Sequence, residues 1–125
     1  MQRIKNGRLV TMEGQVYEQG FVDFQDGKII ALGDMKDMSQ PGLEAFDAAG
    51  GWILPGFVDA HAHIGISEES SRWEGEDCNE ITDPITPPIR AIDGIYPGEL
   101  PFGQALDGGV PSAIVGPGRA HGIGG

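Results

Sequence analysis

Short apolar runs separated by turn residues fill the first third of the chain. Arg3–Lys5 and Arg8–Thr11 flank Asn6-Gly7, and a similar pair of runs flanks Asp26-Gly27. Asn-Gly or Asp-Gly between two such runs favours a β-hairpin, because both central residues of the turn then adopt a positive φ. The pattern therefore predicts a meander of antiparallel strands.

The pattern changes at Pro55-Gly56. Before it, the runs 46–48 and 52–54 predict two more short strands. From Phe57 to Ile64 polar residues occupy every second position, which predicts a strand with one apolar face and one polar face. The stretch from Gly65 to about Gly98 has no clear periodicity, and irregular segments of that length are usually functional or disordered.

The last part of the sequence predicts a βαβ unit. Leu100–Leu106 has a helical pattern that ends at Gly108-Gly109, and Val110–Val115 is one more apolar run. A strand, a crossover that contains a helix, and a second strand imply the start of a parallel sheet. Gly116–Gly125 is predicted to be a glycine-rich loop.

Composition and charge narrow the classes of function. The 125 residues lie within the size of one domain, and 21 of them are glycines, so we expect loops to make up much of the chain. The net charge of -11 argues against a nucleic-acid or anionic-membrane partner, because both need a basic surface. No signal peptide or apolar run of about 20 residues is visible, and the single cysteine, Cys78, fits a reducing compartment. We therefore expect a cytoplasmic protein.

His61 and His63 are the sharpest chemical feature of the sequence. Side chains two residues apart in a strand project from the same face, with Cα atoms about 6.6 Å apart, so two imidazoles can converge on one ion. Neutral imidazole is a common ligand of zinc and related divalent metals. Asp59 lies on the same face one step earlier, where its carboxylate could orient an imidazole. Spacing alone leaves open the alternative that all three are polar residues on the solvated face of a half-buried strand.

The residues around the histidine pair resemble a known family. The run Ile53–His63, Ile-Leu-Pro-Gly-Phe-Val-Asp-Ala-His-Ala-His, resembles the first barrel strand of the amidohydrolase superfamily. Four other segments resemble the imidazolonepropionase-like branch of that superfamily: Gly75–Glu80, Thr82–Pro87, Arg90–Ile95 and Gly116–Gly118. The resemblance spans nearly the whole chain.

This resemblance implies a fold and a reaction. The family combines a small β-sandwich, wrapped by both chain ends, with a (β/α)8 TIM-type barrel that holds one or two divalent metals, with Zn²⁺ as the expected ion. Residues 1–55 would form the N-terminal part of the sandwich and residues 56–125 the first strands of the barrel. The implied fold class is α/β with a β-rich N-terminus. The implied activity is hydrolysis of a C–N bond in a small-molecule amide or cyclic amide by a metal-activated water.

The chain contains only part of the implied site. His61 and His63 match the first-strand metal ligands, whereas the family takes a bridging lysine or glutamate, two further histidines and an aspartate general base from later strands. All three lysines precede the pair, and the only later histidine is His121. A complete barrel needs about 250 residues. We therefore expect a truncated barrel without its C-terminal remainder, with no catalytic residue assigned within the chain and no activity of the chain alone.

Two residues and a second function stay open. His121 follows the second barrel strand, where it could bind substrate or metal or be an exposed loop residue, and Cys78 could be a soft metal ligand. The second function is a self-contained divalent-metal-binding module without catalysis, closed by His121 or a loop carboxylate. A half-barrel would leave the apolar residues Phe57, Val58, Ile114 and Val115 uncovered. A complete module must bury them or cover them by forming a homo-oligomer.

Overall fold

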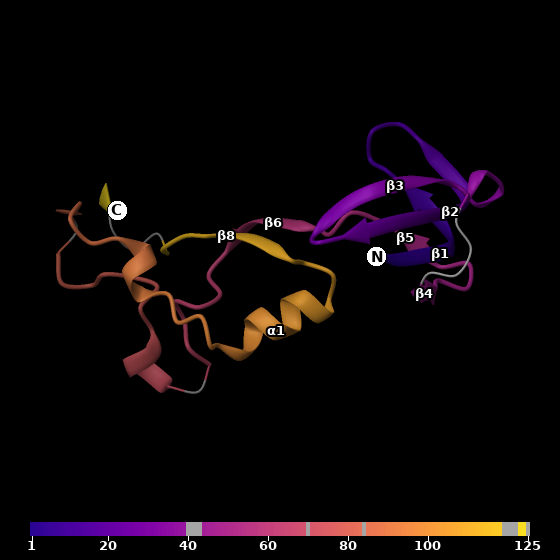
Figure 1. Ribbon diagram of the computed structural model, residues 1–125. Helices are drawn as coiled ribbons and strands as arrows, with labels where there is room; N and C mark the ends of the chain where they lie inside the picture. The colour runs from indigo at the N-terminus through magenta and orange to yellow at the C-terminus, as the bar shows by residue number, and fades with distance from the viewer. Residues whose placement is uncertain (40–43, 70, 84, 119–122, 125) are drawn as a thin grey trace. The chain divides into compact units, whose positions relative to one another are not determined.

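Two compact units, Met1–Pro55 and Gly56–Gly125, make up the chain. The structure is a computed structural model that describes residues 1–39, 44–69, 71–83, 85–118 and 123–124 (Figure 1). Within these residues the first unit consists of strands and one 3-10 turn, and the second unit contains the single α-helix. No helix in the described part of the chain has both the length and the apolar character that crossing a bilayer requires.

A five-stranded sheet forms the first unit. Its strands are β1 (Gln2–Val10), β2 (Val16–Gln25), β3 (Lys28–Asp34), β4 (Glu44–Asp47) and β5 (Trp52–Ile53), with the 3-10 turn η1 (Met35–Asp37) after β3. The first three strands are antiparallel neighbours, which confirms the predicted meander. Asp26 and Gly27 both have positive φ, 53° and 73°, as the predicted hairpin turn requires. β4 and β5 both pair with β1 in parallel.

The predicted hairpin at Asn6-Gly7 is wrong, because these residues form an irregularity inside β1 instead of a turn. Asn6 has a φ of 59°, and the register with β2 shifts on both sides of Gly7. The Asn6 carbonyl accepts a hydrogen bond from the Gly50 N–H at 2.7 Å, and its side-chain amide donates to Asp47 at 2.7 Å. A Cβ at position 7 would lie 2.7 Å from the Gly51 carbonyl oxygen, so glycine is needed there. Pairing with β4 and β5 on either side keeps β1 continuous.

The core of the first unit is a small apolar cluster. Leu9, Val22 and Ile53 are buried together, and three partly buried residues pack against them: Ile4, Tyr17 and Ala48. The three buried members come from β1, β2 and β5, so the cluster joins strands that are far apart in the sequence.

An ion pair is also buried in this sheet. Arg3 and Asp23 face each other across β1 and β2, and an Arg3 Nη2 hydrogen donates to Asp23 Oδ2 at 2.7 Å. Both residues are about 95% buried, at 4% and 5% exposure. The hydrogen bond to Asp23 raises the pKa of Arg3 above its ordinary value, so the guanidinium stays charged in the interior. The guanidinium also lies 5.1 Å from the ring centre of Phe21.

The second unit contains the predicted βαβ arrangement. β6 (Val58–Ala62) and β8 (Ser112–Val115) pair in parallel, and α1 (Leu100–Asp107) lies on the connection between them (Figure 1). β6 is shorter than the predicted strand and ends before His63. Two 3-10 turns, η2 (Arg72–Gly75) and η3 (Ala91–Gly94), interrupt the stretch that was predicted to be irregular.

A second strand pair was not predicted. β7 (Ile85–Thr86) and β9 (Ile123–Gly124) pair in parallel, so the tail that was predicted to be a loop contains a short strand. Each strand has only two residues, which is too short to show an alternating pattern.

Candidate metal centre

The two histidine rings lie close together at the end of β6. Their centroids are 5.2 Å apart and their planes are nearly perpendicular, at 87°. The side chain of His61 is exposed, and that of His63 is half-buried. An ion bound tetrahedrally at about 2.1 Å from one nitrogen of each ring would separate the ring centres by roughly 5 Å. The spacing of the rings therefore fits two ligands of one divalent metal.

The ring of His63 is anchored by a main-chain carbonyl. Its Nδ1 lies 2.7 Å from the oxygen of Gly116, the residue after β8. A carbonyl oxygen only accepts hydrogen bonds, so Nδ1 is the donor in this contact, and in the neutral form of the ring Nε2 then has the lone pair. Metal-binding histidines usually donate their second N–H in this way. The Gly116 N–H donates to the Ala62 carbonyl at 3.1 Å, which holds the anchor beside β6.

The other sequence-predicted site residues have different surroundings. Oδ1 of Asp59 accepts a hydrogen bond from the main-chain N–H of His61 at 3.0 Å, so its described contact is with the strand backbone and not with an imidazole. Cys78 is buried in the loop after β6. His121 lies outside the described residues. Among the described residues no group of three or more His, Cys, Asp or Glu side chains gathers as a metal site, so the histidines form a pair.

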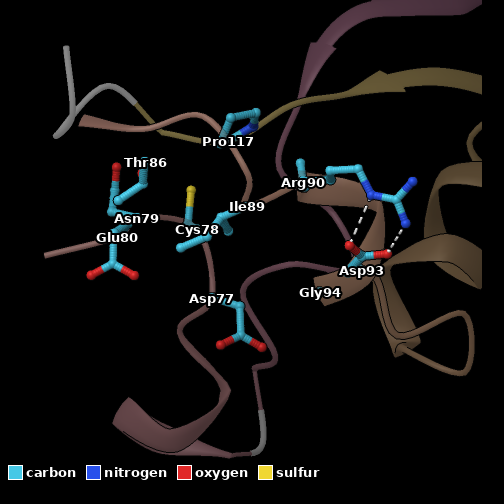
Figure 2. A pocket seen from close by; sticks show the side chains of 11 residues that line it. Asp77, Cys78, Asn79, Glu80, Thr86, Ile89, Arg90, Asp93, Gly94 and Pro117 are labelled. Atoms are coloured by element: carbon cyan, nitrogen blue, oxygen red, sulfur yellow. Dashed lines mark hydrogen bonds and ion pairs between the residues drawn. The ribbon is translucent and has the colours of Figure 1, made fainter. Parts of the chain in front are cut away.

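A pocket of about 320 Å³ lies in the same unit (Figure 2). Pro117, next to the His63 anchor, is one of its lining residues, and all the others come from the segment between β6 and α1. The Gly118 N–H donates to the Cys78 carbonyl at 2.6 Å, and a Cβ at Gly118 would collide with the Asn79 carboxamide. The segment after β8 is therefore fixed against this loop. Because Gly116 and Pro117 are adjacent, the pocket begins next to the residue that anchors His63.

Arg90 and Asp93 form a forked ion pair on the pocket wall (Figure 2). Arg90 Nη2 and Nε donate to the two carboxylate oxygens at 2.8 and 3.0 Å. The hydrogen bonds from Arg90 lower the pKa of Asp93 and raise that of Arg90. The charge of Arg90 is thus already engaged by a carboxylate.

We expect a carbon-13 NMR titration to give Asp93 a pKa below its ordinary value, and Arg90→Gln to move that pKa upward. A pKa lowered by folding means that the pair stabilises the folded chain above the unfolded-state pKa. This stabilisation is lost as the pH falls through the folded-state pKa. An Asp93 titration curve that Arg90→Gln leaves unchanged would contradict the assignment.

Comparison with known proteins gives the site a family context. No protein-family model matches the sequence. An amidohydrolase of Hapsidospora irregularis, tasK, is 40% identical over 80 residues, which are 64% of this chain and 8% of the relative. An imidazolonepropionase of Bradyrhizobium sp. is 46% identical over 66 residues, which are 47% of this chain and 16% of the relative. A D-hydantoinase of Geobacillus stearothermophilus is 39% identical over 63 residues, which are 50% of this chain and 12% of the relative.

A solved structure matches nearly the whole fold. The crystal structure of an amidohydrolase from Thermotoga maritima superposes with a TM-score of 0.83 at 36% identity, over 97% of this chain and 31% of that protein. The chain is related to the amidohydrolases. The predicted resemblance to amidohydrolases is thereby confirmed, and the strand-rich structure matches the N-terminal part of an amidohydrolase. The chain spans between 8% and 16% of the length of these curated relatives.

Sequence reasoning missed the residue that anchors the amidohydrolase-like histidine pair. Gly116 was noted as part of a glycine-rich segment and of a segment that resembles the imidazolonepropionase-like branch, but not as a partner of His63, because the contact uses a main-chain carbonyl. A carbonyl is present at every residue, so only the parallel pairing of β6 and β8 could have pointed to it. That pairing was predicted, and it places the residue after β8 beside the end of β6, where His63 lies.

Proposed function

We propose that the chain contributes His61 and His63, as the first two metal ligands, to a metal-dependent hydrolase that cleaves a C–N bond in a small-molecule amide or cyclic amide. The observation that carries this proposal is the His63 ring anchored by Gly116, with its centroid 5.2 Å from that of His61. A divalent ion held there, with Zn²⁺ as the expected metal, supplies Lewis-acid activation of water and of the amide carbonyl. The relatedness to amidohydrolases supports the reaction class.

The residues of the chain have separate roles in this proposal. His61 and His63 supply neutral nitrogen ligands, and the Gly116 carbonyl keeps the His63 ring in the tautomer that leaves Nε2 free. The pocket that begins at Pro117 accommodates the part of the substrate beyond the reacting amide. Its wall carries acidic groups and one arginine that is paired with Asp93, so neutral or hydrogen-bond-donating substrate groups suit it better than anionic ones.

The exposed apolar residues of the second unit support this proposal over a self-contained metal module. Phe57, Val58 and Ile114 are 59%, 65% and 63% exposed, while Val115 is half-buried. A complete module would bury such a set or cover it by homo-oligomerisation. In a (β/α)8 barrel, further strands and helices cover the corresponding faces. We therefore propose that residues 56–125 correspond to the start of such a barrel and residues 1–55 to part of the accompanying β-sandwich.

Zinc titration of the 125-residue chain by calorimetry tests the proposal. We expect weak binding, because two imidazoles alone satisfy only half of a tetrahedral shell, and we expect His61→Ala/His63→Ala to abolish it. His121→Ala is the matched control and should leave the affinity unchanged. Amide and cyclic amide hydrolysis, assayed in parallel, should show no turnover by the chain alone.

The alternatives give different results. Zinc binding that persists in His61→Ala/His63→Ala would overturn the assignment of the pair. Tight stoichiometric binding that His121→Ala weakens would favour the closed metal-binding module. Turnover by the isolated chain would contradict the claim that further ligands are needed.

A further inference from the structure

A buried carboxylate holds the loop that follows the histidine pair. Glu99 is only 8% exposed, although it is charged and directly precedes α1. Its Oε2 accepts a hydrogen bond from the main-chain N–H of Gly65, and its Oε1 accepts one from the N–H of Glu69 at 3.0 Å. The side chain makes no capping hydrogen bond to α1. Its described hydrogen bonds therefore go to the 65–69 loop, which lies 30 to 34 positions away in the sequence.

That loop begins two residues after His63. The N–H of Ile66 donates to the His63 carbonyl at 3.3 Å, which closes a turn directly after the proposed ligand. Gly65 has a φ of 84°, and its carbonyl accepts a hydrogen bond from the Tyr96 N–H at 2.7 Å. Both main-chain polar groups of Gly65 are thus bound by the segment 96–99. Gly116 holds the His63 ring, and this turn holds the His63 backbone.

A carboxylate suits this position better than any neutral side chain. Each of its two oxygens accepts one of the two N–H groups, which offsets the cost of burying the charge. A glutamine of the same shape has one oxygen and one NH2 group, and the NH2 would face a main-chain N–H that is also a donor. Loss of either hydrogen bond leaves a main-chain N–H of the loop without its acceptor.

We propose that Glu99 is a positioning residue for the His61–His63 metal pair, acting through the Gly65–Glu69 loop. The proposal rests on the proposed function, because it assumes that the pair binds a metal. It adds a residue that touches neither imidazole and that lies in a different part of the chain. Removing a hydrogen-bond partner of a metal ligand itself costs about 10- to 100-fold in metal affinity, and we expect the lower end of this range here because Glu99 acts through the loop.

Co²⁺ titration of the full 125-residue chain tests this role, because bound Co²⁺ has an absorption spectrum that reports the ligand geometry. Wild type, Glu99→Gln and the matched control Glu74→Gln, an exposed glutamate of the same unit, are compared. We expect Glu99→Gln to bind Co²⁺ at least tenfold more weakly and to shift the absorption bands, with Glu74→Gln unchanged. Amide NMR of the apo forms should show the Gly65 and Glu69 signals moving in Glu99→Gln only.

The outcomes separate this proposal from the proposed function. Wild-type affinity and an unchanged Co²⁺ spectrum in Glu99→Gln would overturn the positioning role, even if the variant melts at a lower temperature, since a purely structural residue would behave in that way. Co²⁺ binding by wild type that is insensitive to His61→Ala/His63→Ala would overturn the proposed function, and the positioning role with it. Glu99→Asp, whose shorter side chain keeps the charge, should recover part of the affinity lost in Glu99→Gln; no recovery would contradict the need for a carboxylate.

Discussion

Asp23→Ala is expected to lower the free energy of unfolding of the first unit by about 3–5 kcal/mol. The substitution leaves the Arg3 guanidinium, at 4% exposure, without the carboxylate that binds it. Isolated charge is far more costly to bury than a charge paired with good geometry. Urea unfolding followed by Trp52 fluorescence, in a Trp73→Phe background so that only the first unit reports, measures the effect.

Two controls separate burial from charge pairing as such. Glu18→Ala removes the partner of Arg8 at 3.4 Å, but both side chains of that pair are exposed, so a loss below about 1 kcal/mol is expected. Arg3→Met/Asp23→Leu removes both buried charges and should recover most of the stability lost in Asp23→Ala. Equal losses in Asp23→Ala and Glu18→Ala would show that burial of the first pair carries no special cost.

Gly65→Ala is expected to destabilise the second unit by roughly 2–5 kcal/mol, the sum of two effects. The φ of 84° is unfavourable for any residue with a Cβ. A Cβ there would also lie 2.7 Å from Cζ of Phe102 and 3.2 Å from Cγ2 of Ile95, so the packing around the loop must shift. Urea unfolding followed by Trp73 fluorescence, in a Trp52→Phe background, reports the change.

Gly103→Ala is the matched control for Gly65→Ala. Gly103 lies within α1, and a Cβ there would meet nothing within 4 Å. Alanine in this helix should stabilise the unit by about 0.5–1 kcal/mol, because it restricts the unfolded chain. If the two substitutions have effects of the same sign and size, the loop after His63 is not strained by a side chain at position 65.

The fold was predictable wherever local pattern decides the structure. Apolar runs on either side of Asp26-Gly27 were sufficient for the β2–β3 hairpin, and helical spacing was sufficient for α1. Asn6-Gly7 was not predictable in this way, since the same dipeptide fits a hairpin turn or an irregular strand. The choice depends on two hydrogen bonds with residues more than 40 positions later: the Gly50 N–H donates to the Asn6 carbonyl, and the Asp47 carboxylate accepts from the Asn6 side-chain amide.

The candidate site was predictable to the same extent. His61 and His63 follow from a period of two along β6, which is a local property. The groups that hold His63 and the loop after it come from distant parts of the chain: the Gly116 carbonyl contacts His63 across 53 positions, and Glu99 contacts Gly65 across 34. Neither contact has a local signature, because a carbonyl is common to all residues and a glutamate before a helix is ordinarily exposed.

The irregularity at Asn6 determines which side chains of β1 share a face of the first sheet. Ile4 and Leu9 are five positions apart, which in an uninterrupted strand puts their side chains on opposite faces, yet Leu9 belongs to the apolar cluster and Ile4 packs against that same cluster. The shift in register therefore resets the phase of the alternation partway along β1. Deleting Asn6 would leave Ile4 and Leu9 four positions apart, which keeps both side chains on one face of a regular strand without the irregularity. In this strand, one residue of length determines which side chains share a face as strongly as the identity of the side chains does.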